Sequence, residues 1–166
     1  MRKVKKLVCF AATRVLFYAL KVLVSRDSRV REAFSAYRTG YVFRLNAGME
    51  TDDARLTFCI AENGGLAKMK DDAPADMEIT MKTVHEAFKV FVGVTGIADA
   101  YARHWFFVKG NPYETMGLVR GLELAEAYLF PSFLAKRILS RVPHKQCAAM
   151  RVYGAMLFLL LGDVLS

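Results

Sequence analysis

Cysteine is scarce in this chain of 166 residues, which contains only Cys9, Cys59 and Cys147. The three are far apart and each lies among apolar residues, so they match neither a disulfide framework nor the spacing of a zinc site. We therefore expect three reduced core residues, as is usual in a cytoplasmic protein.

Acidic residues are scarce at the two ends of the chain. Residues 1–38 carry ten Lys and Arg against two acids, and residues 131–166 carry five against one, whereas residues 39–130 carry nine against thirteen. The acidic middle argues against a nucleic-acid groove through the centre of the protein. Ends that are both basic and apolar are typical instead of contact with an anionic membrane surface.

Motifs of catalysis are also missing. The sequence has no Gly-rich phosphate loop and no serine elbow, and His85, His104 and His144 include no pair at the spacing of a helical metal site. The remaining acids are interpreted as ordinary turn and helix residues: Asp52 and Asp53, Asp71 and Asp72, Glu123 and Glu126. The sequence therefore predicts no catalytic residue, no metal ligand and no cofactor.

Long uncharged stretches are absent from both ends. The longest uncharged runs there, residues 7–13 and 152–162, are well below the roughly 20 apolar residues of a spanning helix. Placed on a helix, Lys3, Arg14 and Lys21 form one polar stripe on an otherwise apolar surface. We expect an N-terminal helix that either docks on the protein's own core or lies in a membrane interface, and a C-terminal helix of the same kind.

Apolar residues, by contrast, make up 54% of the chain, and its mean hydropathy is positive. This composition excludes disorder as the main state and, at this length, predicts one domain with extra elements. Some of the apolar surface is expected to have a use beyond folding.

The period of the apolar residues changes along the chain. Alternation predicts five strands, over residues 41–45, 54–60, 66–70, 76–82 and 105–109. Helical spacing and capping signals predict helices that begin at Asp27 or Ser28, at Thr83, near Ala98 and at Asn111, the last of which ends or kinks at Pro131. The chain thus mixes strands and helices.

Residues 76–122 resemble the sterol carrier protein type-two-like family. That family shares a strand of the form Asp-x-apolar-x-apolar, a capped helix, a short linker helix, a Gly-bounded strand and a further helix. The corresponding segments here are Asp76 to Met81, Thr83 to Val92, Ile97 to His104, Trp105 to Gly110 and Asn111 onward. This chain departs from the family at Arg103 and His104, where a Gly is common, and at Asn111, where an Asp is common.

The resemblance covers about residues 39–130 and implies an α+β fold, in which an antiparallel sheet of about five strands is covered by helices around an apolar tunnel. Members occur as lipid-transfer proteins, as domains of lipid enzymes and as bacterial accessory proteins, some in isoprenoid quinone synthesis. A helical extension like residues 1–38 resembles the last group most. We therefore divide the chain into residues 1–38, 39–130 and 131–166, a central domain with two helical extensions.

Lipid binding of this kind needs apolar walls rather than a motif, because removing apolar area from water stabilises a complex by about 25 cal/mol per Å². Each residue below could equally be ordinary core. The candidate wall residues are Met77, Ile79, Met81, Phe88, Phe91, Trp105, Phe107, Met116 and Val119.

The sequence therefore predicts a protein that is not an enzyme and that binds a sterol, fatty acyl or isoprenoid lipid non-covalently, for transfer or presentation at a membrane. We expect it in the cytoplasm or at the inner face of a membrane, in contact through residues 1–38 and 131–166. The alternative is an interaction or scaffold module that fills its own cavity and binds a protein partner. A third reading is an enzyme with a site near His104 and Glu114.

Overall fold

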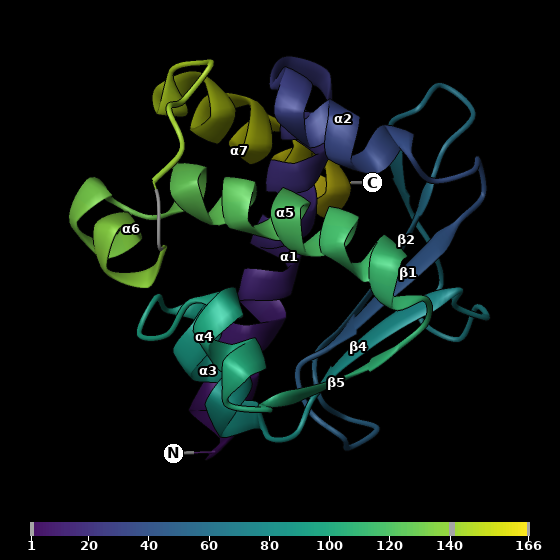
Figure 1. Cartoon of the computed structure of the whole chain (residues 1–166), viewed down its shortest axis with the longest axis vertical. Coiled ribbons are helices and arrows are strands. Elements are labelled where there is room, and N and C mark those ends of the chain that lie inside the picture. Colours follow the sequence, from purple (N-terminus) through teal and green to yellow (C-terminus); the bar gives the residue numbers. More distant parts are fainter. Residues whose placement is uncertain (1, 140–141, 166) are drawn as a thin grey trace.

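A computed structural model describes residues 2–139 and 142–165. It contains a single sheet with helices along one face (Figure 1). The helices are α1 (Arg2–Arg26), α2 (Ser28–Ser35), α3 (Val84–Phe91), α4 (Ile97–Ala102), α5 (Pro112–Leu129), α6 (Ser132–Ile138) and α7 (Ala149–Leu165). The strands are β1 (Val42–Asn46), β2 (Arg55–Ile60), β3 (Leu66–Lys68), β4 (Met77–Met81) and β5 (Phe106–Lys109).

The predicted α+β class and the five strands are confirmed, in the order β3-β2-β1-β4-β5. The expectation of a wholly antiparallel sheet is wrong at one place, because β1 and β4 run parallel. Asp76, just before β4, fixes this pairing: its carboxylate accepts the backbone N–H of Val42 at 2.8 Å, and its own N–H donates to the Val42 carbonyl at 2.9 Å. Alternation of apolar residues is the same in either direction and could not reveal it.

The core lies between the sheet and the helices. Phe43 and Phe58 stack on neighbouring strands, with ring centroids 5.1 Å apart, and Phe34 of α2 meets Phe43 edge-on. On the opposite face of the sheet most side chains of β1 and β4 are polar, and several bond to one another. Asn46 donates to Glu78 at 2.6 Å and to Thr80 at 2.9 Å. Only one face of the sheet therefore offers an apolar interior.

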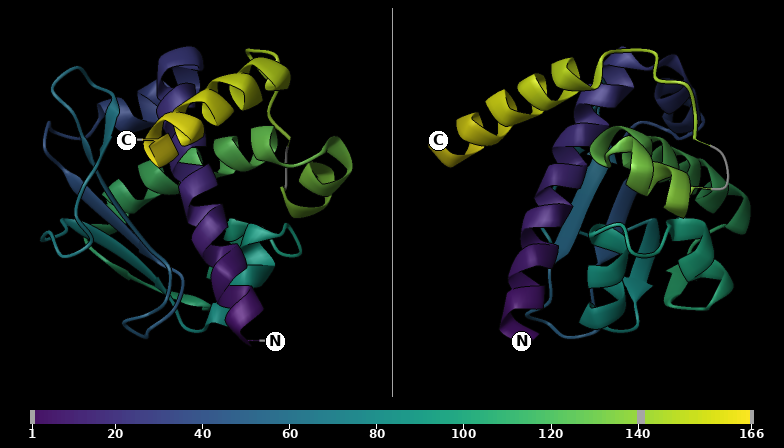
Figure 2. Two further views of the ribbon diagram at one scale, coloured as in Figure 1. Left: turned by 180° about the vertical axis from the view of Figure 1, so that it is seen from behind. Right: turned by 90° about the vertical axis from the view of Figure 1, so that its left-hand side faces the viewer.

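Helix α1 runs through the middle of the helical layer and packs against α2, α3, α5 and α7 (Figures 1 and 2). Among the described helices it alone has the length and composition to cross a membrane, yet 56% of its most apolar window is buried in the protein. Its first turns are tied to the loop after β1, where Lys6 lies 2.7 Å from Asp52 and 2.9 Å from Asp53. Of the two alternatives for this segment, docking on the protein's own core is the one observed.

Helix α7 crosses α1, and its C-terminal end extends beyond the rest of the protein (Figure 2). The chain before it is held by Tyr128, which is buried and whose hydroxyl accepts the backbone N–H of Gln146 at 2.8 Å and donates to Asp27 at 2.8 Å. Asp27 in turn caps α2 and pairs with Arg29. One hydrophobic core includes residues of all three predicted segments.

Candidate functional site

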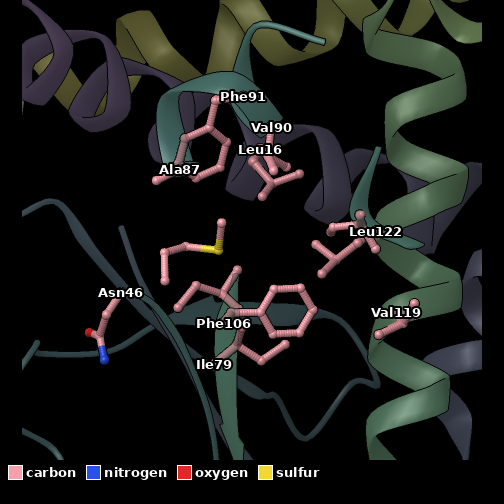
Figure 3. Close-up of a pocket in the computed structure, with 12 residues that line it drawn as sticks. Leu16, Asn46, Ile79, Ala87, Val90, Phe91, Phe106, Val119 and Leu122 are labelled. Carbon is pink, nitrogen blue, oxygen red and sulfur yellow. The ribbon is translucent and has the colours of Figure 1, made fainter. Parts of the chain in front are cut away.

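An apolar cavity of about 50 Å³ lies between the sheet and the helices (Figure 3). Ile79 and Phe106 from the sheet lie on one side of it, and Leu16 of α1 and Phe91 of α3 lie on the other. Asn46 is the polar residue of the lining, and its amide oxygen and nitrogen are engaged by Arg55, Glu78 and Thr80 on the far face of the sheet. The interior of this cavity is therefore hydrocarbon.

The structure brings together some of the nine candidate wall residues and separates others. Ile79, Met81, Phe91 and Val119 line the cavity. Met77 is fully buried without lining it, and Phe88 and Trp105 are half-buried against the core. Phe107 and Met116 are 53% and 66% exposed and lie outside the lining. A role in lipid binding stays a prediction for the four that line the cavity.

The expectation that Phe107 faces the interior is wrong because of the register between β4 and β5. Residues opposite each other in a sheet share a face, and Met81 pairs with Phe106 while Thr80 pairs with Phe107. Phe106 therefore points inward beside Met81, and Phe107 joins the polar face, where Lys82 lies over its ring at 5.0 Å. Sequence reasoning missed Phe106, and only the pairing with β4 could have identified it.

Met116 is displaced from the interior by the orientation of α5. The helix buries Leu118 and Leu122, whereas Met116 points to solvent. Leu122 lines the cavity together with Leu16, and neither was among the candidates. Leu16 was missed because the resemblance covers the chain only from about residue 39 onward.

A second cavity, of about 220 Å³, adjoins the first on its α1 and α7 side. Ala12 and Val15 of α1 face Tyr153 and Met156 of α7 across it. The two cavities share five lining residues: Leu16, Val90, Phe91, Ile97 and Leu122. The two cavities are therefore direct neighbours in the space between the sheet and the helices.

Glu126 of α5 lines the second cavity and is only 6% exposed. Its Oε2 has no hydrogen-bond partner among the described residues. Burial, with a smaller contribution from Glu123, raises the pKa of Glu126 to about 8, although a backbone hydrogen bond from Ile97 opposes the rise. The interpretation of Glu126 as an ordinary exposed helix acid is thus wrong, and at pH 7 the side chain is mostly neutral.

Other polar groups on the described part of the chain are engaged with one another. The cluster of Glu50, Asp52 and Asp53 surrounds the Lys6 ammonium, which offsets part of its negative charge. Glu114 accepts the Tyr41 hydroxyl at 2.5 Å, and no described contact joins it to His104. The third reading, an enzyme site near His104 and Glu114, therefore has no support in the described geometry.

No protein-family model matches the chain, and no curated protein matches its sequence. Solved structures similar to it include the ubiquinone synthesis protein UbiJ-SCP2, at 16% identity over 64% of this chain and 89% of that chain, with a TM-score of 0.46. Another is sterol carrier protein domain 2 of Helicoverpa armigera, at 17% identity over 75% of this chain and 89% of that chain, with a TM-score of 0.42. A third is apo sterol carrier protein 2 of Yarrowia lipolytica, at 15% identity over 69% of this chain and 91% of that chain, with a TM-score of 0.42. The names of these proteins indicate the kind of protein that residues 76–122 resemble.

Proposed function

We propose that the protein binds the hydrocarbon part of a lipid non-covalently in the two adjoining cavities. The observation that carries the proposal is their arrangement: two largely apolar spaces share five lining residues and together extend from α7 to the sheet. A hydrocarbon chain that occupies both would lie between α7 and the sheet. Each Å² of apolar area that it buries contributes about 25 cal/mol.

The size of the cavities favours a thin ligand. Pockets for small molecules usually measure about 300–1,000 Å³, and these are about 50 and 220 Å³. A single acyl or isoprenoid chain has a small cross-section, and Met81 and Met156, one in each lining, are flexible enough to re-pack around it. We therefore favour an acyl or isoprenoid chain over a rigid sterol.

Contact with a membrane is proposed through α7 rather than α1. Helical spacing places Met150, Leu157, Phe158 and Leu161 within an arc of roughly 100° on α7, and each is more than half exposed. On α1, by contrast, Arg2 and Lys6 are paired with Glu50. An exposed apolar face next to the second cavity suits transfer or presentation of a lipid at the membrane surface, on its cytoplasmic side.

Two matched variants test the cavity. Ala12 lines the second cavity and Ala11 is its exposed neighbour on α1. Ala12→Trp fills the space, so we expect it to abolish uptake of a fluorescent long-chain hydrocarbon probe with an uncharged end, while Ala11→Trp retains uptake. Native mass spectrometry of the purified wild type should also detect a bound lipid. Equal uptake by both variants would contradict the proposed site.

A separate pair tests the membrane contact. We expect Phe158→Asp on α7 to lower binding to phosphatidylglycerol vesicles by roughly tenfold or more, because it places a charge on the apolar face. Leu7→Asp, at an exposed position on α1, serves as the control and should have a smaller effect. The opposite ranking would assign the contact to α1.

The second candidate is an interaction module that binds a protein partner. The small inner cavity favours it, because about 50 Å³ leaves most of the interior filled by the protein's own side chains. The same exposed face of α7 would then receive the partner. Absence of any bound lipid, together with unchanged behaviour of Ala12→Trp, would select this alternative.

A further inference from the structure

Glu126 is the one acid among the described residues that lines the second cavity, and its immediate surroundings are apolar. Leu122 precedes it by one helical turn and Leu129 follows it by nearly one, and both line the same space. Phe91 of α3 and Met156 of α7 complete the surroundings. The carboxyl group thus faces a hydrocarbon cavity, with Oε2 unpaired among the described residues.

Folding accounts for one oxygen of the Glu126 carboxyl group and not for the other. The backbone N–H of Ile97, at the start of α4, bonds to the carboxyl group, whereas Oε2 has no partner and Glu126 forms no ion pair with a described residue. A buried polar group without a partner destabilises a fold, and an apolar residue of similar size would pack without that cost. An unsatisfied buried group of this kind needs an explanation, and a ligand atom is one.

No described charge is directed at the carboxyl group apart from Glu123 on the same helix. The charged groups of the neighbouring helices have other partners: Asp99 pairs with Arg103 at 3.0 Å, Lys89 lies over Trp105, and Arg14 lies over Phe10. The hydroxyl of Tyr153, which lines the cavity from α7, donates to the Tyr128 and Leu129 carbonyls at 2.8 Å.

We propose that the Glu126 carboxyl group holds the hydroxyl head of the bound lipid, so that the ligand is a long-chain alcohol rather than a charged lipid. This inference rests on the proposed function. A neutral carboxyl group has one oxygen that donates and one that accepts. A hydroxyl pairs with either oxygen, so it satisfies Oε2 whichever atom carries the proton.

Charged head groups fit the same place poorly. An anionic head would lie beside two acids, Glu123 and Glu126, with no described cation to offset it. A cationic head would ionise Glu126 and bury an ion pair among hydrocarbon, where the loss of hydration of both charges opposes their attraction. A hydroxyl avoids both effects because it brings one polar atom and no charge.

The test compares two probes that differ only in the hydroxyl. Radiolabelled hexadecan-1-ol and hexadecane are offered from phosphatidylcholine vesicles, and the amount taken up by the full-length protein is measured. We expect the wild type to prefer the alcohol by roughly tenfold, which corresponds to about one buried hydrogen bond. Glu126→Gln should keep the preference, because its amide also donates and accepts, and Glu126→Leu should lose it while still binding hexadecane.

Glu62→Leu, at an exposed position outside both cavities, is the control and should behave as the wild type. A second readout needs no variant that might misfold: the infrared carbonyl band of the neutral carboxyl group in the wild type should shift on addition of hexadecan-1-ol and stay in place with hexadecane. Hexadecylamine, offered in the same way, is a third probe with a cationic head. Equal uptake of hexadecan-1-ol and hexadecane, or preference for hexadecylamine over hexadecan-1-ol, would overturn the inference and leave the proposed function intact. Uptake of neither probe would instead contradict the proposed function.

Discussion

Helices α1 and α7 look alike in sequence and differ in the folded protein. Both are apolar and lie in basic ends of the chain. Ten residues of α1 are buried, among them Leu20 and Leu23 with no exposed surface. Helix α7 buries Val152 and Met156, and Phe158 on its other side is 78% exposed. The C-terminal half of α1 is thus a core helix, although Val4 and Leu7 near its start are exposed, whereas α7 keeps an apolar face exposed along most of its length.

Apolar composition alone therefore does not assign a helix to a membrane. The basic residues of α1 act within the fold, where Lys6 binds three acids of the loop after β1. The charge pattern that suggests membrane contact for residues 1–38 is thus partly used in tertiary structure. For residues 131–166, membrane contact remains a proposal, and we assign it to α7.

The largest expected effect is a contrast between two leucines, one on each helix. Leu23→Ala removes a fully buried side chain of α1 and should lower the free energy of unfolding by about 2–5 kcal/mol. Leu157→Ala, at a position 57% exposed on α7, should change it by less than about 0.5 kcal/mol. Urea unfolding measures both. Similar losses would mean that α7 is as much a core helix as α1.

The next effect concerns the attachment of α7. Tyr128→Phe removes the hydroxyl that joins Asp27 to the backbone of Gln146 and leaves the buried carboxylate of Asp27 with one donor fewer. We expect a loss of about 1–3 kcal/mol in the free energy of unfolding. Tyr113→Phe is the control, since Tyr113 is 90% exposed. A neutral Tyr128→Phe would show that this junction does not hold the C-terminal segment.

A pH dependence is expected from Glu126, which lies between the two helices. Its folded pKa of about 8 exceeds the ordinary value of 4.5, so the folded protein holds a proton that the unfolded chain has already lost. Stability should therefore fall between about pH 4.5 and pH 8, by at most about 1.4 kcal/mol per pH unit. Glu126→Gln removes this slope, and Glu62→Gln, at an exposed site, does not. If the stability of Glu126→Gln and of the wild type changed with pH in the same way, Glu126 would be ionised in the folded protein over this pH range.

The smallest effect is expected from the ion pairs of α1. Lys6→Met leaves Glu50, Asp52 and Asp53 without their shared cation. Raising the salt from about 0.1 M to 1 M shortens the screening length from about 10 Å to 3 Å, so the wild type should lose some stability and the variant should not. Lys3→Met is the control, because no described acid pairs with Lys3. If salt changed the stability of the wild type and of Lys6→Met equally, the ion pairs of Lys6 would contribute nothing measurable to the free energy of unfolding.

Much of the secondary structure could be predicted from the sequence. Thr83 and Asn111 cap α3 and α5 as expected, and Asp27 caps α2. The alternation of Met77, Ile79 and Met81 fits the observed β4. Helix α6, which begins directly after Pro131, was not predicted, because its seven residues carry no capping signal of their own.

The candidate site was harder to predict. The cavity-lining residues of β4 and α3 could be predicted from the alternation and the helical spacing of apolar residues, because both patterns involve only residues close together in the sequence. The choice between Phe106 and Phe107 depends on which residue of β4 each one faces, and a shift of one residue exchanges the two faces of a strand. Glu126 gives no signal in the sequence, because its burial results from other helices that meet around it.

Most element types, the capping residues and the apolar character of both ends follow from the sequence, because each of these depends on neighbours within a few residues. The inward face of β5, the burial of α1 rather than α7, and the raised pKa of Glu126 follow from the folded arrangement. These depend on contacts between residues far apart in the chain. Burial by such contacts sets both the pKa of Glu126 and the space beside it.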